Sequence, residues 1–91
     1  MTEEIVKPII DMMKKDFDSH DFIKEFIWQQ PAMYGEMLMM YNNVTTVHSL
    51  IGRFLLDHAS SLEIRKIGEN ESDDLFGHPT PCAQWYNINK E

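Results

Sequence analysis

The sequence predicts a mostly α-helical protein that ends in a β-hairpin, an α+β fold with a core of three or four helices. Apolar residues recur at helical spacing in several successive segments. The clearest of these segments, Thr45–Leu62, runs directly into Glu63–Ile67, where two β-branched isoleucines stand among charged residues. A turn-rich stretch then leads to a second candidate strand, Cys82–Ile88. This order favours a helix docked against an antiparallel hairpin.

Two helices are expected before the proline at position 31. The first follows a tail, residues 1–4, that we expect to fray, and its apolar side chains are Ile5, Val6, Ile9, Ile10, Met13 and Phe17. Because proline fits only the first turn of a helix, Pro8 predicts that this helix begins close to it. Asp18 and Ser19 predict a break and a new N-cap. The second helix then carries an apolar stripe made of Phe22, Ile23, Phe26, Ile27 and Trp28.

The segment Pro31–Tyr41 is apolar on nearly every side, and Glu36 is its one charged residue. Its proline suits a first helical position, and Asn42 and Asn43 suit the cap and turn that follow. A helix of this composition is either central to the fold or packed against another chain, and we expect it to fill the core. The alternative is a homodimer or partner-binding face, whose candidate residues are Met33, Tyr34, Met37, Met40 and Tyr41, with Met39 beside them.

The longest helix is expected to run unbroken over residues 46–61. Thr45 and Thr46 are its candidate N-caps, because a hydroxyl can accept a hydrogen bond from a free first-turn N–H. One face is an apolar stripe formed by Val47, Leu50, Ile51, Phe54, Leu55, His58 and Leu62. The opposite face holds polar or small residues, namely His48, Ser49, Gly52, Arg53 and Ser60. Ile51 and Phe54 are therefore expected to be core residues whose truncation to alanine destabilises the protein strongly.

The last third of the chain is expected to be a hairpin with a long connection. Strands are predicted near Glu63–Ile67 and Ala83–Ile88, paired antiparallel. Between them Gly68–Thr80 is rich in turn-forming residues, which predicts a wing-like loop. Leu75 and Phe76 are expected to anchor the middle of that loop against the body of the protein.

Trp85 is the strongest core candidate outside the helices. Its large apolar ring gains from burial, and its indole N–H needs one hydrogen-bond partner. It shares one face of the predicted strand with Ala83 and Asn87. Residues 89–91 are expected to form a tail, and the whole chain, 1–91, is predicted to be a single domain because no repeat or internal boundary is visible.

Three helices followed by a hairpin resemble, by element order alone, the winged helix–turn–helix domain. In that resemblance Pro31–Tyr41 is the second helix, Thr45–Leu62 the recognition helix and Glu63–Ile88 the wing. The resemblance implies nucleic-acid binding. The residues that would contact bases or phosphates are Thr45, Thr46, His48, Ser49 and Arg53 on the helix, with Arg65 and Lys66 on the wing contacting the backbone.

The charge balance opposes nucleic-acid binding. The chain has a net charge of −7, and affinity for duplex DNA depends mainly on cations that neutralise phosphates. The predicted wing loop carries acidic residues where a wing would need to attract phosphate, namely Glu69, Glu71, Asp73 and Asp74. A partner protein with a basic surface suits this charge better, so sequence-specific DNA binding is kept as the alternative function.

No motif indicates a metal, a cofactor or a reaction. His78 and Cys82 stand four positions apart, but a structural zinc site usually needs about four ligands in two close pairs. No base is close to Cys82 in sequence, so we do not expect it to act as a nucleophile. The N-terminal acids, Asp11, Asp16, Asp18 and Asp21, have the spacing of exposed helix faces and first turns. We therefore expect no cofactor, no metal and no enzyme activity.

The sequence thus predicts a small acidic regulatory or inhibitory protein that acts through contacts with a partner protein or a second copy. Its one cysteine fits a reducing cytoplasm, and neither a membrane-spanning stretch nor a signal peptide is visible. In type, it resembles the small accessory proteins of phages and mobile elements.

Overall fold

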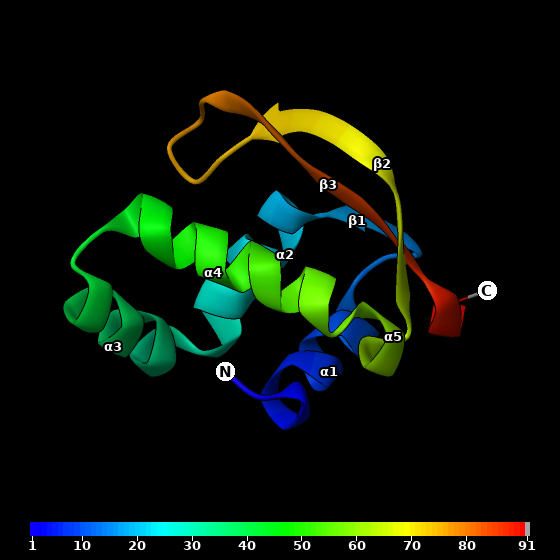
Figure 1. The fold of residues 1–91 in the computed structure, drawn as a ribbon, viewed down its shortest axis with the longest axis horizontal. Helices are drawn as coiled ribbons and strands as arrows, with labels where there is room; N and C mark the ends of the chain where they lie inside the picture. The colour runs from blue at the N-terminus through cyan, green and yellow to red at the C-terminus, as the bar shows by residue number, and fades with distance from the viewer. Residues whose placement is uncertain (91) are drawn as a thin grey trace.

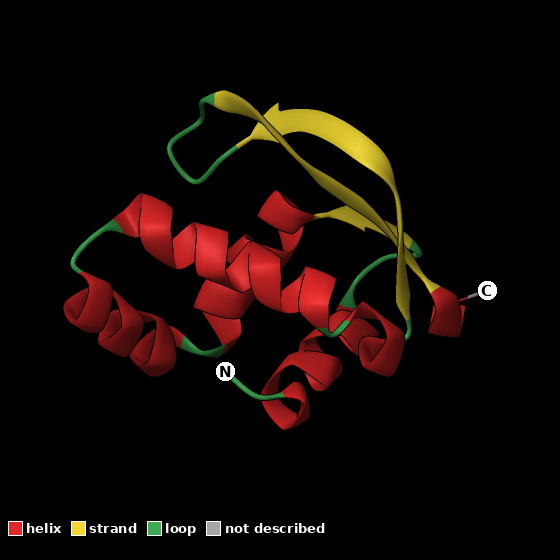
Figure 2. Cartoon of the chain, in the orientation of Figure 1, coloured by secondary structure: helices red, strands yellow, loops and turns green. Residues whose placement is uncertain are grey.

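Residues 1–90 are described by the computed structural model, and in this range the chain forms five α-helices, one 3-10 turn and three strands. The helices lie on one side of the sheet, with α4 running beneath the hairpin and α3 at the periphery (Figures 1 and 2). The helices are α1 (Glu3–Met12), α2 (Ser19–Gln29), α3 (Pro31–Tyr41), α4 (Val44–Asp57) and α5 (Ala59–Leu62). The strands are β1 (Asp16–Asp18), β2 (Ile64–Asp73) and β3 (Pro79–Asn87), and the 3-10 turn η1 is Ile88–Lys90.

The three strands form an antiparallel sheet in the order β1-β3-β2. The predicted pairing of the last two strands is confirmed. The short edge strand β1 was not predicted. Trp85 on the central strand pairs with Phe17 on one side and with Lys66 on the other. The register slips between Lys66 and Gly68, where a glycine at positive φ accommodates a β-bulge.

The core lies between the helices and the inner face of the sheet. Its buried apolar side chains are Val6, Ile9, Ile10, Phe17, Phe22, Ile23, Phe26, Tyr34, Val47, Ile51, Leu55, Leu62, Ile64 and Trp85. Trp85 is only 1% exposed, and its indole N–H donates to Ser19 Oγ at 3.0 Å. The prediction that this tryptophan anchors the core and needs one polar partner is therefore confirmed.

The longest helix is interrupted, which corrects the prediction of one unbroken helix over 46–61. α4 ends at Asp57, and His58 has φ −112° and ψ 13° before α5 begins. The His58 ring stacks on Phe54 with a centroid distance of 4.1 Å, and its Nδ1 lies 2.9 Å from Glu3 Oε2. These contacts hold the residue between two helical segments.

The start of α4 also differs from the prediction. Asn43, not Thr45 or Thr46, is the N-cap, because its side-chain oxygen accepts from the Thr46 N–H at 2.9 Å. The two threonines lie in the first turn and are exposed. Asn42 adopts the left-handed conformation that ends α3, as a cap-forming asparagine can.

In the N-terminal half, α1 begins at Glu3, so Pro8 lies inside the helix and not near its start. The predicted break at position 18 is confirmed as a capping box. Asp18 accepts from the Asp21 N–H at 2.8 Å, and Asp21 accepts from the Asp18 N–H at 3.0 Å. Pro31 occupies the first turn of α3, as predicted.

The wing-like loop is much shorter than predicted. Residues 68–73 continue β2, and only 74–78 separate the two strands. Leu75 and Phe76 do not anchor the loop against the body, since they are 43% and 62% exposed. The turn is instead held by Asp74, whose Oδ1 accepts from the Phe76 and His78 N–H groups at 2.9 and 3.0 Å.

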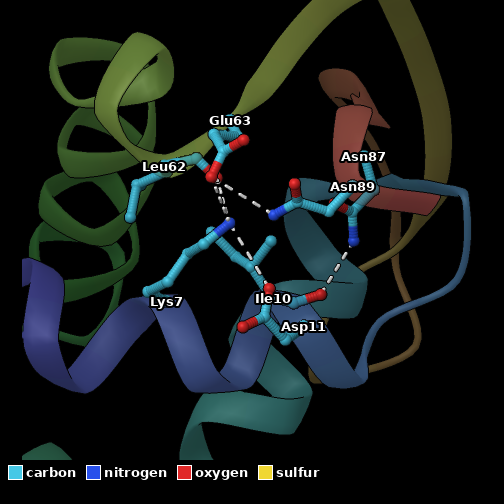
Figure 3. A network of polar contacts seen from close by, with 7 residues as sticks. All are labelled: Lys7, Ile10, Asp11, Leu62, Glu63, Asn87 and Asn89. Atoms are coloured by element: carbon cyan, nitrogen blue, oxygen red, sulfur yellow. Dashed lines mark hydrogen bonds and ion pairs between the residues drawn. The ribbon is translucent and has the colours of Figure 1, made fainter. Parts of the chain in front are cut away.

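A polar network joins α1 to the start of β2 and the end of β3 (Figure 3). Lys7 Nζ donates to the Leu62 carbonyl at 3.1 Å and lies 3.5 Å from a Glu63 carboxylate oxygen. The Asn87 side chain, which is fully buried, donates to the Ile10 carbonyl at 2.8 Å. Asn89, in the segment predicted to be a tail, hydrogen-bonds Glu63. Residue 91 lies outside the described residues.

Candidate functional site

The apolar helix α3 has two different sides. Tyr34 is buried, and Met33 and Met37 pack partly against the core. Met40 and Tyr41, near the end of the helix, are 75% and 44% exposed. The expectation that α3 fills the core therefore describes only its inner side, and the candidate partner-binding residues are divided between the two sides.

The exposed part of α3 also includes Met39, which is 85% exposed. We call Met39, Met40 and Tyr41 the α3 end. The exposure of the α3 end follows from the composition of the helix. A helix that is apolar all round cannot be covered completely when neighbouring helices pack against only one of its sides. α3 contacts α2 and α4 and otherwise lies at the periphery of the fold (Figure 1).

The candidate nucleic-acid-binding residues of α4 are only partly available. Thr45, Thr46, Ser49 and Arg53 are exposed. His48 is half-buried, and its Nε2 lies 2.7 Å from the Tyr34 hydroxyl. Burial lowers the pKa of His48, with His20 adding to the decrease and Asp74 opposing it. This histidine is therefore held as a neutral hydrogen-bonding partner of α3.

The cations of the predicted interface are already engaged within the chain. Arg53 pairs with Asp57 at 3.0 Å, and Lys66 pairs with Glu69 at 2.8 Å. The Arg65 guanidinium lies over the Tyr86 ring, 5.1 Å from its centroid. Each cation therefore has an intramolecular partner that a phosphate would have to displace or share.

A cleft of about 700 Å³ lies between α4, the beginning of α2 and the β2–β3 hairpin. Residues from all three elements line it, including His20, His48, Arg53, Lys66, Phe76 and Cys82. The His48 and Arg53 side chains belong to the α4 face discussed above, and Phe76 belongs to the hairpin turn. Polar groups and an aromatic ring thus face the same open space.

At one side of this cleft, β1, α2 and the hairpin bring together a polar cluster that the sequence did not reveal. One ligand atom each from Asp18, His20 and Cys82 lies within 4.8 Å of the other two. Ser72 joins them, because its Oγ is 2.8 Å from His20 Nδ1 and 3.7 Å from Cys82 Sγ. The second imidazole nitrogen of His20, Nε2, lies 3.2 Å from Thr80 Oγ1.

Asp18 is the most buried member of this cluster, at 5% exposed. Burial alone would raise the pKa of Asp18, but hydrogen bonds from Asp21, Ser72 and Asn70 and the charge of His20 outweigh it and lower that pKa. The Asn70 side-chain amide donates to Asp18 Oδ2 at 2.9 Å. The carboxylate is therefore ionised at neutral pH and fixed in position, as a cation ligand or a hydrogen-bond acceptor must be.

Along the sequence the histidine nearest to Cys82 is His78, whereas in the fold Cys82 lies beside His20. His78 lies in the exposed hairpin turn and is not part of the three-residue group. In the sequence, Asp18 was recognisable only as an N-cap. That pattern gives the local role of Asp18 but not its partners on the hairpin.

No protein-family model, curated protein or solved structure matches this chain. Among residues 1–90, no helix is long and apolar enough to cross a membrane.

Proposed function

We propose that this chain is a small acidic, non-catalytic regulatory or inhibitory protein that acts by binding a partner protein through the α3 end. The single observation that carries the proposal is the exposure of Met39, Met40 and Tyr41 on a helix with almost no polar residues. Exposed apolar side chains gathered at one end of a helix favour an interaction surface there. Methionine side chains adapt to varied partner surfaces because they are flexible and polarizable.

The charge of the chain supports a basic partner over a second copy. Two copies with a net charge of −7 each repel one another at long range, whereas a basic surface is attracted. The helical body followed by the β2–β3 hairpin supports a winged-helix-like frame for this binding protein. Such a frame would use α3, and not α4, to contact its partner.

The experiment compares two exposed methionines. Met40→Lys changes the α3 end, and Met12→Lys makes the same change on α1, where the methionine is 62% exposed. Both variants should fold like the wild type, because neither side chain is in the core. Affinity capture, together with sizing chromatography and light scattering, should show that Met40→Lys loses the partner or the oligomer while Met12→Lys keeps it. Equal retention by both variants would contradict the proposal, and a wild-type dimer lost in Met40→Lys would identify a second copy as the partner.

Sequence-specific DNA binding is the second candidate, because Thr45, Thr46, Ser49 and Arg53 form an exposed polar face on α4. The intramolecular pairs of Arg53 and Lys66 and the net charge disfavour it. We expect negligible binding to random duplex DNA at physiological salt, measured by mobility shift. A salt-sensitive shift that is abolished by Arg53→Ala with Arg65→Ala would favour DNA binding instead.

A further inference from the structure

The polar cluster beside the cleft has the composition of a metal site. Asp18 and His20 offer a carboxylate and an imidazole, and Cys82, more than sixty positions later, offers a thiol. Their ligand atoms all lie within 4.8 Å of one another. Zinc is bound in proteins by these three groups. Calcium and magnesium prefer sites made only of oxygen, so the sulfur and nitrogen donors point to zinc or a similar transition metal.

The spacing of the three groups is close to what zinc requires. Tetrahedral coordination with bonds of 2.0–2.3 Å places ligand atoms roughly 3.3–3.8 Å apart. A movement of about 1 Å by side chains would bring the present group to that geometry. His20 and Cys82 are only half-buried, whereas Asp18 is buried and held in place by Asp21 and Asn70.

The surrounding hydrogen bonds suit ligation through His20 Nδ1. That nitrogen faces Ser72 Oγ at 2.8 Å, and the same hydroxyl lies 3.7 Å from Cys82 Sγ, so Nδ1 is on the side of the Cys82 thiol. The opposite nitrogen, Nε2, is 3.2 Å from Thr80 Oγ1 and can donate its proton there. Metal-binding histidines are commonly oriented by such a bond from the second ring nitrogen. Rotation of Ser72 about one bond would move its hydroxyl out of the space between the ligands or make it a fourth ligand.

We propose that Asp18, His20 and Cys82 bind a zinc ion, with water or the Ser72 hydroxyl in the fourth position. The ion connects the start of α2 to the β2–β3 hairpin beside the cleft. This inference rests on the cluster alone and does not depend on partner binding by the α3 end.

Cobalt(II) is the probe, because it reports thiolate ligation by absorbance. Titration of the reduced wild-type protein should reach one equivalent and produce a sulfur-to-cobalt charge-transfer band, and zinc should displace it. Cys82→Ser should remove the band, and His20→Gln should weaken binding at least about tenfold. Zinc at roughly a hundred times its Kd should raise Tm by on the order of 10 °C in a chain of this length.

Two controls keep the result decisive. His78→Ala removes an exposed histidine outside the group and should bind cobalt like the wild type. Cys82 is the single cysteine of the chain, so protection of the wild-type thiol from iodoacetamide by zinc tests ligation without any substitution. Failure of the wild-type protein to bind cobalt or to protect its thiol would overturn the proposal. Unchanged cobalt binding in folded Cys82→Ser and His20→Gln proteins would overturn it equally.

Discussion

Replacing Trp85 by alanine should remove a large share of the stability of the fold. The side chain is 1% exposed and lies on the central strand, between Phe17 and Lys66 in the register. Truncation of a buried tryptophan costs about 3–5 kcal/mol, and loss of its hydrogen bond leaves the buried Ser19 hydroxyl without this donor. A chain of 91 residues has a total stability of roughly 5–14 kcal/mol. At about 4–8 °C per kcal/mol, Tm should fall by at least about 12 °C.

The matched control is the other tryptophan. Trp28 is 80% exposed on α2, so Trp28→Ala should change the free energy of unfolding by no more than about 0.5 kcal/mol. Urea unfolding followed by far-UV circular dichroism is the suitable assay, because each variant retains a different tryptophan and their fluorescence is not comparable. A loss below about 0.5 kcal/mol for Trp85→Ala would refute the packing described for the central strand.

Two further predictions concern α4. Ile51→Ala should lower the free energy of unfolding by about 2–5 kcal/mol, measured in urea, because Ile51 is 0% exposed. Leu50→Ala, at a position 38% exposed, should lower it clearly less. Equal losses would show that the face of α4 assigned to the core is not the buried one. His48 should make stability fall as the pH drops through about 6.5, because its pKa is lowered by burial and the unfolded chain takes up the proton first. Unfolding free energies near pH 7.5 and pH 5.5 should therefore differ less in His48→Gln than in the wild type, and an unchanged difference would exclude this histidine as the cause.

Local patterns in the sequence were enough to locate the hairpin strands and the helices, but not their true ends. β2 was cut short in the prediction because Glu69, Glu71 and Asp73 resemble a solvated loop. In the fold these acids face solvent, while Asn70 and Ser72 between them are half-buried and hydrogen-bonded to Asp18 and His20. Exposed and half-buried residues therefore alternate along this part of β2, as in an ordinary strand. The inward positions hold polar residues, so the sequence shows no alternation of hydrophobic and polar residues there.

The break in the longest helix has a similar origin. His58 fits the apolar stripe of a continuous helix, and nothing in its neighbourhood predicts an interruption. Its conformation is fixed with the help of Glu3, which lies 55 positions earlier in the chain. An interaction at that separation is not visible in any local window, and for the same reason the sequence paired Cys82 with the nearby His78 and not with His20.

Asp18 has two roles, because it caps α2 and also accepts a hydrogen bond from the hairpin. Only the cap was visible in the local sequence. Exchanging the side chains at positions 18 and 70 separates the two roles. One carboxylate oxygen caps α2 through the Asp21 N–H, and the other accepts from the Asn70 amide. Asp18→Asn can keep the cap, because asparagine is an equally good N-cap, but it replaces the charged acceptor opposite Asn70 by a neutral amide and so weakens the bond. Asn70→Asp instead sets two carboxylates against each other.

Each single change should therefore cost about 1–3 kcal/mol of unfolding free energy. The double exchange, Asp18→Asn with Asn70→Asp, restores a bond between an amide and a carboxylate and should recover most of that loss. A double-mutant cycle in urea measures the recovery as a coupling energy. Additive losses would show that Asp18 acts only as a helix cap and that the hairpin is not held to α2 through this bond.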